Sequence, residues 1–156
     1  MNIGLILFQY LHVLAGCILL GSAFFIYFVL WPGILSRPSD EARAFYESIL
    51  KRTKIWMAAA AGMTFLLGLI RGIVFGPMGS KEAWGTPYGI TFSIALVSTL
   101  AMLIYTPRIG PALLKKVWDG KSFAPNAAQI VKSANAVPFV FLIVVLACMI
   151  LMHFGF

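Results

Sequence analysis

The sequence predicts an all-α integral membrane protein: an antiparallel bundle of four transmembrane helices with amphipathic cytoplasmic helix extensions. Composition is the first reason, because 61% of the 156 residues are hydrophobic, only 11% are charged, and the mean hydropathy is +0.94. Patterning is the second, because the apolar residues gather into four long runs. The third is that the basic residues lie mostly between these runs. We expect the whole chain, 1–156, to form a single transmembrane domain.

The first expected span, residues 3–30, contains no charged residue. A helix of this length reaches about 42 Å, which exceeds the ~30 Å hydrocarbon core of a bilayer. Trp31, Pro32 and Gly33 follow it. We expect them to end the helix at the membrane surface, because Trp favours the interface and Pro and Gly break helices. The run has no basic start and no prompt cleavage site, so we interpret it as a retained helix rather than a signal peptide.

Residues 39–54 predict a helix that continues into the second span, about 55–75. This segment begins with a capping Ser and two acidic residues and ends with three basic residues, an arrangement that suits the helix dipole. Its apolar residues recur at helical spacing on one face. We therefore expect an amphipathic cytoplasmic extension of the second span.

Three glycines, Gly68 and Gly72 in the second span and Gly76 directly after it, recur at intervals of four. Small residues let helix backbones approach closely in a membrane, so this stripe predicts packing against another helix of the same chain, with a homodimer seam as the alternative. Arg71 lies about one turn from the outer end of the span. Its simplest interpretation is a side chain that snorkels to the interface, and a buried functional charge is the alternative.

The third and fourth spans are expected at about 88–106 and 138–155. Pro107 and Pro111 should interrupt the exit of the third span, because a proline removes a helical hydrogen bond. An Asp-Gly pair at 119–120 predicts a turn of the chain. The polar residues 126–135 are expected to lead into the fourth span, which begins just after a proline.

The basic residues predict the orientation. Five lie between the first two spans and five between the last two, whereas the middle connection holds only Lys81. Cytoplasmic connections are enriched in Lys and Arg, so the first and third connections are expected in the cytoplasm and both termini outside it. The net charge of +7 is therefore interpreted as orienting the protein in a lipid bilayer rather than as binding nucleic acid.

A group of soft metal ligands lies near the end of the fourth span. At 100° per residue, its members fall within an arc of about 140°; they are Cys148, Met149, Met152 and His153. Thiol, thioether and imidazole groups suit copper, particularly Cu(I), although Met and Cys also serve as ordinary packing residues. The sequence has none of the common catalytic motifs, which favours a binding or transport protein over an enzyme.

His12 lies in the middle of the first span, where a polar side chain is costly and often functional. Helix rise places it roughly 14 Å below the outer surface, compared with roughly 12 Å for Cys148 and roughly 5 Å for His153. His12 is therefore expected to share a level with Cys148 or Met149 and to lie away from His153. The alternative is a neutral imidazole that bonds a neighbouring hydroxyl group.

Several segments together resemble a known family. They are L-H-V-L-A-G-x-x-L-L-G-S-A-F-F at 11–25, K-R-T-K-I-W at 51–56, G-L at 68–69 and N-A-V-P at 135–138. This pattern resembles the copper-resistance D (CopD)-like superfamily, which also includes HemJ-type protoporphyrinogen oxidases and uncharacterised four-helix proteins. In the copper branch the resemblance implies movement of copper across the inner membrane. In the HemJ branch it implies haem b bound by a first-helix histidine, which His12 matches.

The leading expectation is therefore a protein that binds or moves copper, with His12, Cys148, Met149, Met152 and His153 as candidate ligands. A haem b-binding redox protein that uses His12 is the alternative. The chain has Tyr88 and Gly89 where the HemJ branch carries a lysine, a departure that argues against protoporphyrinogen oxidation. A third possibility is a non-catalytic accessory subunit, either in a homo-oligomer or in a larger membrane complex.

Overall fold

The computed structural model describes residues 3–156, apart from the side chains of residues 50 and 51. Helices dominate the described chain, and four of them are long and apolar enough to cross a membrane: Ile3–Leu35, Arg52–Ile73, Pro87–Val117 and Ala127–His153. The elements in order are α1 (Ile3–Phe25), the π-helical turn η1 (Ile26–Leu30), α2 (Trp31–Leu35), α3 (Ser39–Ile73), the short helices η2 (Pro77–Gly79) and η3 (Glu82–Gly85), α4 (Pro87–Val117), β1 (Trp118–Asp119), β2 (Ser122–Phe123) and α5 (Ala127–His153). An all-α membrane protein is thereby confirmed.

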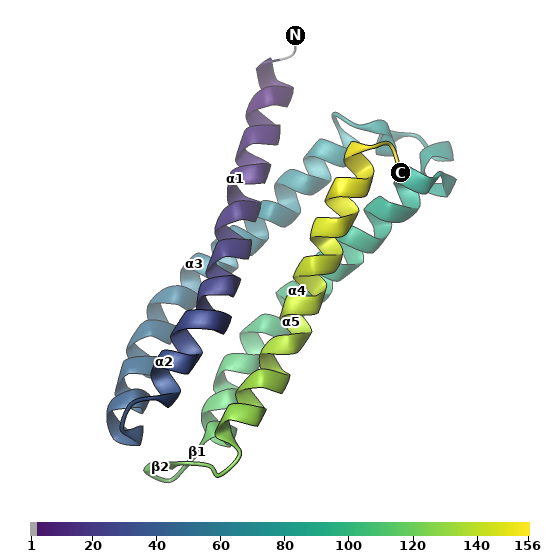
Figure 1. Cartoon of the computed structure of the whole chain (residues 1–156). Helices are drawn as coiled ribbons and strands as arrows, with labels where there is room; N and C mark the ends of the chain where they lie inside the picture. Colours follow the sequence, from purple (N-terminus) through teal and green to yellow (C-terminus); the bar gives the residue numbers. More distant parts are fainter. Residues whose placement is uncertain (1–2) are drawn as a thin grey trace.

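The long helices lie beside one another in pairs (Figure 1). α1 packs against α3, α4 packs against α5, and α3 also contacts α4. The N-terminus and the C-terminus lie at one end of the molecule, and the β1–β2 hairpin lies at the opposite end. We call these the terminal end and the hairpin end.

The expectation that Trp31, Pro32 and Gly33 end the first helix is wrong. The helical path continues through η1 and α2 as far as Leu35. Proline in a helix clashes with the carbonyl group one turn earlier, and the wide π-turn directly before Pro32 relieves that crowding. Trp31 does not face the lipid interface either. It is only 2% exposed, and its ring centroid lies 4.8 Å from that of Tyr46.

Pro107 and Pro111 were also expected to interrupt a helix, and they do not, because both lie inside α4. Pro138, which was expected at the start of the fourth span, lies inside α5. The polar segment 126–135 is already part of α5 from Ala127 onwards. In long apolar helices, neighbouring helices and local backbone adjustments compensate for the hydrogen bond that a proline removes.

The single helix predicted over residues 39–54 and the second span is confirmed, because α3 is continuous from Ser39 to Ile73. Its first turn is held to the hairpin. The Trp118 indole N–H donates to the Ser39 carbonyl oxygen at 3.0 Å, and Arg43 donates to the Gly120 carbonyl oxygen at 3.1 Å. The predicted turn at Asp119–Gly120 is also confirmed: it joins β1 to β2, with Gly120 at a φ of +62°.

The glycine stripe lies on two interhelical contacts of the same chain. A Cβ atom at Gly68 would lie 3.1 Å from the Cε1 atom of His12 on α1. A Cβ atom at Gly72 would overlap the ring of Phe92 on α4. The predicted close packing within the chain is therefore confirmed for these two glycines. Because glycine has no side chain, α1 and α4 can approach the backbone of α3 closely at these positions.

Candidate functional site

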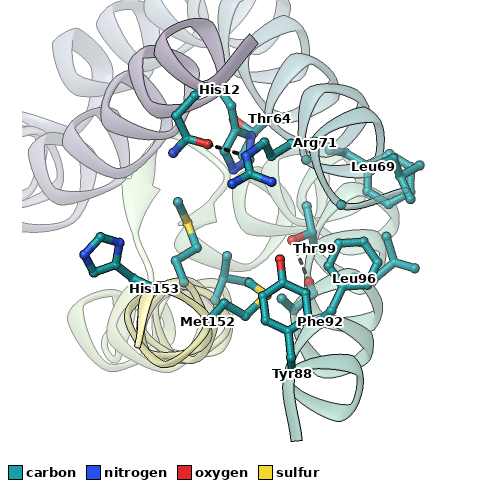
Figure 2. Close-up of a pocket in the computed structure, with 17 residues that line it drawn as sticks. His12, Thr64, Leu69, Arg71, Tyr88, Phe92, Leu96, Thr99, Met152 and His153 are labelled. Atoms are coloured by element: carbon teal, nitrogen blue, oxygen red, sulfur yellow. Dashed lines mark hydrogen bonds between the residues drawn. The ribbon is translucent and has the colours of Figure 1, made fainter. Parts of the chain in front are cut away.

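A cavity of about 190 Å³ lies near the terminal end and is lined by residues of α1, α3, α4 and α5. We call it the four-helix cavity (Figure 2). The apolar part of its wall includes Leu69, Phe92 and Leu96. Its polar and sulfur-bearing lining residues are Gln9, His12, Thr64, Arg71, Tyr88, Thr99, Met149, Met152 and His153. A cavity of this kind, with a few convergent polar groups, is the usual form of a binding site.

Four of the five ligands predicted from the sequence line this cavity, namely His12, Met149, Met152 and His153. The three residues from α5 stand at positions i, i+3 and i+4, which lie on one helix face. Cys148 is buried but does not line the cavity. It is rotated by about 100° from its neighbour Met149, which places it at the edge of that face.

His12 is held between α1 and α3. Its ring packs on the bare backbone of Gly68, and the backbone of Thr64 lies beside the imidazole. The Nδ1 atom is buried and has no hydrogen-bond partner among the described residues. The Thr64 hydroxyl donates to the Ala60 carbonyl oxygen of its own helix, at 2.8 Å. The alternative in which a hydroxyl group holds His12 therefore finds no support at Nδ1, and the contact of the imidazole with Thr64 is to its backbone.

Arg71 and Gln9 extend the site beyond the residues predicted from the sequence. The Arg71 Nε–H group donates to Gln9 Oε1 at 2.8 Å and so joins α3 to α1. Both side chains line the cavity, and Arg71 is only partly exposed. Helical spacing was the available signal. Gln9 precedes His12 by three residues and Arg71 follows Gly68 by three, so the pairs share the faces that meet at the α1–α3 contact.

Tyr88 was noticed in the sequence only as a departure from the HemJ pattern, yet it lines the cavity. Its position is set by the tight start of α4. The Thr86 side chain caps the helix by accepting the Gly89 N–H at 3.1 Å. Gly89 lies so close to the Ala83 carbonyl oxygen that a Cβ atom there would overlap it. This packing holds the first turn of α4, which carries Tyr88, against η3.

His153 lies at the margin of the cavity. Its side chain is exposed, and Figure 2 shows its ring on the other side of α5 from Tyr88. Met152 belongs to the same end of α5 and packs against the cluster formed by Met78, Ala83 and Phe92. The sequence predicted that His153 would lie away from His12, yet both residues line the same cavity.

The chemistry of the lining restricts which metal or cofactor it suits. Among the described residues, no group of three or more His, Cys, Asp or Glu side chains is placed to hold a metal ion. A metal in this cavity would therefore need thioether ligands beside imidazole, which is the donor set that favours Cu(I). Haem fits less well, because about 190 Å³ is below the roughly 300–1,000 Å³ of pockets that enclose ligands of drug size or larger.

A second cavity, of about 230 Å³, lies between α1, α3, α4 and α5 towards the hairpin end and is mainly apolar. Two buried polar atoms of its lining residues, Thr106 Oγ1 and Asn135 Nδ2, have no hydrogen-bond partner among the described residues.

Comparison with known proteins gives no relative for this chain. It matches no protein-family model, no curated protein and no solved structure.

Proposed function

We propose that this protein binds copper, as Cu(I), in the four-helix cavity and moves it across a bacterial inner membrane. One observation carries the proposal. The cavity brings the His12 ring, whose Nδ1 atom is buried and unpartnered, together with the thioethers of Met149 and Met152. Imidazole and thioether are suitable Cu(I) ligands, and the protein supplies them from different helices.

The residues have different proposed roles. His12 supplies the nitrogen ligand, and Met149 and Met152 supply soft sulfur ligands from the facing helix. His153, exposed at the cavity margin, is placed to take up the ion before it reaches His12. Cys148, which does not line the cavity, is assigned a packing role in this arrangement.

We further infer that the membrane-embedded protein is an antiparallel four-helix bundle with periplasmic termini and a cytoplasmic hairpin end. The distribution of Lys and Arg supports this orientation. Both termini lie at the same end of the structure (Figure 1), as this topology requires. The start of α3 and the hairpin would then form the cytoplasmic extensions, and the four-helix cavity would lie on the periplasmic side.

Haem b is the second candidate, because a histidine imidazole such as that of His12 is a common axial ligand of haem iron. Accommodating haem would require the cavity to widen considerably, which makes copper the better account. The two candidates differ in an observable property, since a haem protein has a Soret absorption band and a Cu(I) protein is colourless.

The test is a Cu(I) titration of the purified protein against a chromophoric competitor. We expect His12→Ala to weaken Cu(I) binding by at least about tenfold, which corresponds to about 1.4 kcal/mol. Met149→Leu and Met152→Leu should each weaken it, because they keep the side-chain volume but remove the sulfur. Met63→Leu is the matched control, since Met63 lies in the α3 span, is 49% exposed and does not line the cavity.

Three outcomes separate the candidates. Full Cu(I) affinity in His12→Ala would refute the copper site. A Soret band that disappears in His12→Ala would support the haem b protein instead. Wild-type protein that binds neither group and co-purifies with a larger complex would support the accessory subunit.

A further inference from the structure

We infer that the four-helix cavity also contains an oxyanion-binding site, in which the Arg71 guanidinium and the Tyr88 hydroxyl bind the oxygens of one carboxylate or phosphate group. The site shares the cavity with the proposed copper ligands but does not depend on copper. The evidence for it comes from Arg71 and Tyr88 and from the positive charge of Arg71. The evidence for the copper site comes from His12 and the thioethers of Met149 and Met152.

The first step is the hydrogen bonding of Arg71. Its Nε–H group is used by Gln9, and that bond holds the plane of the guanidinium across the α1–α3 contact. The two terminal nitrogens, Nη1 and Nη2, carry four more N–H groups. None of these has an acceptor among the residues that the structure describes. The anchored guanidinium therefore offers a rigid set of unused donors.

The second step is the charge of Arg71. No aspartate or glutamate lines the cavity, and within the described part of the chain the only ion pair is Arg43–Glu47, on the exposed start of α3. A charged side chain in a membrane-spanning segment is costly unless it pairs or reaches water. Arg71 is partly buried, and its Nε–H group is bonded to a side chain of another helix. An anion in the cavity would neutralise this charge.

The third step is the direction of Tyr88. Figure 2 shows the Arg71 guanidinium and the Tyr88 hydroxyl pointing into the cavity from opposite sides. The hydroxyl of Tyr88 has no hydrogen-bond partner in the part of the chain that the structure describes. Two unused donor groups, one of them charged, thus converge on the same space. Charge-assisted hydrogen bonds of this kind are roughly twice as strong as neutral ones.

The geometry of the donors selects the ligand class. A planar guanidinium matches the two oxygens of a carboxylate or phosphate, which it can bind through two parallel N–H···O bonds. The cavity volume of about 190 Å³ admits a small anion or a single headgroup. Two sources can supply this chemistry: a small free acid, or the phosphodiester of a lipid at the membrane surface. The oxygen atoms that Arg71 and Tyr88 bind are equivalent in both.

The experiment uses the full-length, copper-free protein in detergent, titrated calorimetrically with sodium acetate and with inorganic phosphate at constant ionic strength. We expect saturable binding of at least one of them by the wild type. Arg71→Gln should abolish it, and Tyr88→Phe, which removes only one oxygen, should weaken it several-fold. Lys81→Gln is the control, because Lys81 is an exposed cation between η2 and η3 that does not line the cavity.

A second measurement distinguishes the two sources. Phospholipid that co-purifies with the wild type and is lost in both Arg71→Gln and Tyr88→Phe identifies the lipid phosphodiester as the anion. Saturable binding of acetate or phosphate without such a lipid identifies a free acid. If Arg71→Gln does not fold, the comparison of Tyr88→Phe with the wild type decides, since that change keeps the ring.

The proposal is overturned if the wild type binds neither anion and retains no phospholipid, or if Arg71→Gln and Tyr88→Phe behave as the wild type does. His12→Ala keeps this result separate from the copper proposal. It should lose Cu(I) and retain the anion, whereas Arg71→Gln should lose the anion and retain Cu(I).

Discussion

The imidazole of His12 rests on the backbone of Gly68, at the point where α1 and α3 cross. A methyl group at Gly68 would lie 3.1 Å from His12 Cε1 and 3.6 Å from Nδ1. The first distance is shorter than ordinary van der Waals contact between carbon atoms, so any side chain at position 68 must displace the ring. The glycine stripe therefore positions the candidate ligand as well as packing the helices.

Gly68→Ala should consequently weaken Cu(I) binding several-fold without unfolding the protein, because it shifts the His12 ring by a few tenths of an ångström. Gly62→Ala is the matched control: Gly62 lies on the same helix, and nothing comes within 4 Å of a Cβ atom there. Replacing Gly by Ala in a helix interior is worth up to about 1 kcal/mol of stability, so the control should be neutral or stabilised. Competition titration measures the affinity, and equal Cu(I) affinity in both variants would contradict the prediction.

Gly72→Leu should lower the melting temperature in detergent, because even the first side-chain atom overlaps the Phe92 ring. Overpacking of this kind typically costs about 1–3 kcal/mol. Gly62→Leu places the same side chain in open space on the same helix and serves as the control. A melting temperature of Gly72→Leu equal to that of the wild type would show that this contact does not hold α3 to α4.

Burial raises the pKa of Tyr46, which lies on α3 before its spanning part, to about 12. The side chain is only 5% exposed, and its hydroxyl donates a long, 3.5 Å bond to the Gly110 carbonyl oxygen. Because the pKa in the folded protein exceeds the usual value of 10, the stabilisation of the neutral form is complete below pH 10 and is lost as the pH rises towards 12. Ultraviolet titration should show a phenol that ionises near pH 12.

Tyr46→Phe should remove that titration and change the stability only slightly, since the hydrogen bond it deletes is long. Loss of stability between pH 10 and pH 12 should become smaller in the variant than in the wild type. If the high-pH ionisation persists in Tyr46→Phe, another group is responsible for it.

The thioether and histidine site should lie on the periplasmic side. A topology reporter fused after Phe156 is expected to be active only in the format that senses the periplasm, because the positive-inside rule places both termini there. A second fusion at Gly120, in the hairpin, should be active only in the cytoplasmic format. The reverse result would place the four-helix cavity on the cytoplasmic side and reverse the proposed direction of uptake.

Thr106→Val should leave the stability unchanged or raise it by about 1 kcal/mol. The Thr106 hydroxyl is buried without a hydrogen-bond partner among the described residues, and an apolar group of similar shape removes the cost of desolvating it. Thr99→Val is the comparison, because the Thr99 hydroxyl donates to the Ala95 carbonyl oxygen at 2.8 Å. A clear loss of stability in Thr106→Val would indicate that the hydroxyl binds a ligand or water in the second cavity.

The membrane class, and the candidate residues whose chemistry is unusual in hydrocarbon, could be predicted from the order of the amino acids alone. Uninterrupted hydrophobicity requires a helix in lipid, and helical spacing alone placed Met149, Met152 and His153 on one face. The same reasoning predicted that glycines at intervals of four would pack closely, as Gly68 and Gly72 do. These properties are local, because they depend only on residues within a few turns of one another.

Which helix faces meet, and which helices continue past their prolines, could be seen only in the folded chain. The π-turn that lets the first helix pass Pro32, and the burial of Trp31 against Tyr46, depend on packing between elements. So do the bond from Arg71 to Gln9 and the convergence of Arg71 and Tyr88, because these residues come from different helices. Helical spacing shows which residues share a face of one helix. The cavity depends on how four helices are rotated and offset against one another, which only the packed fold specifies.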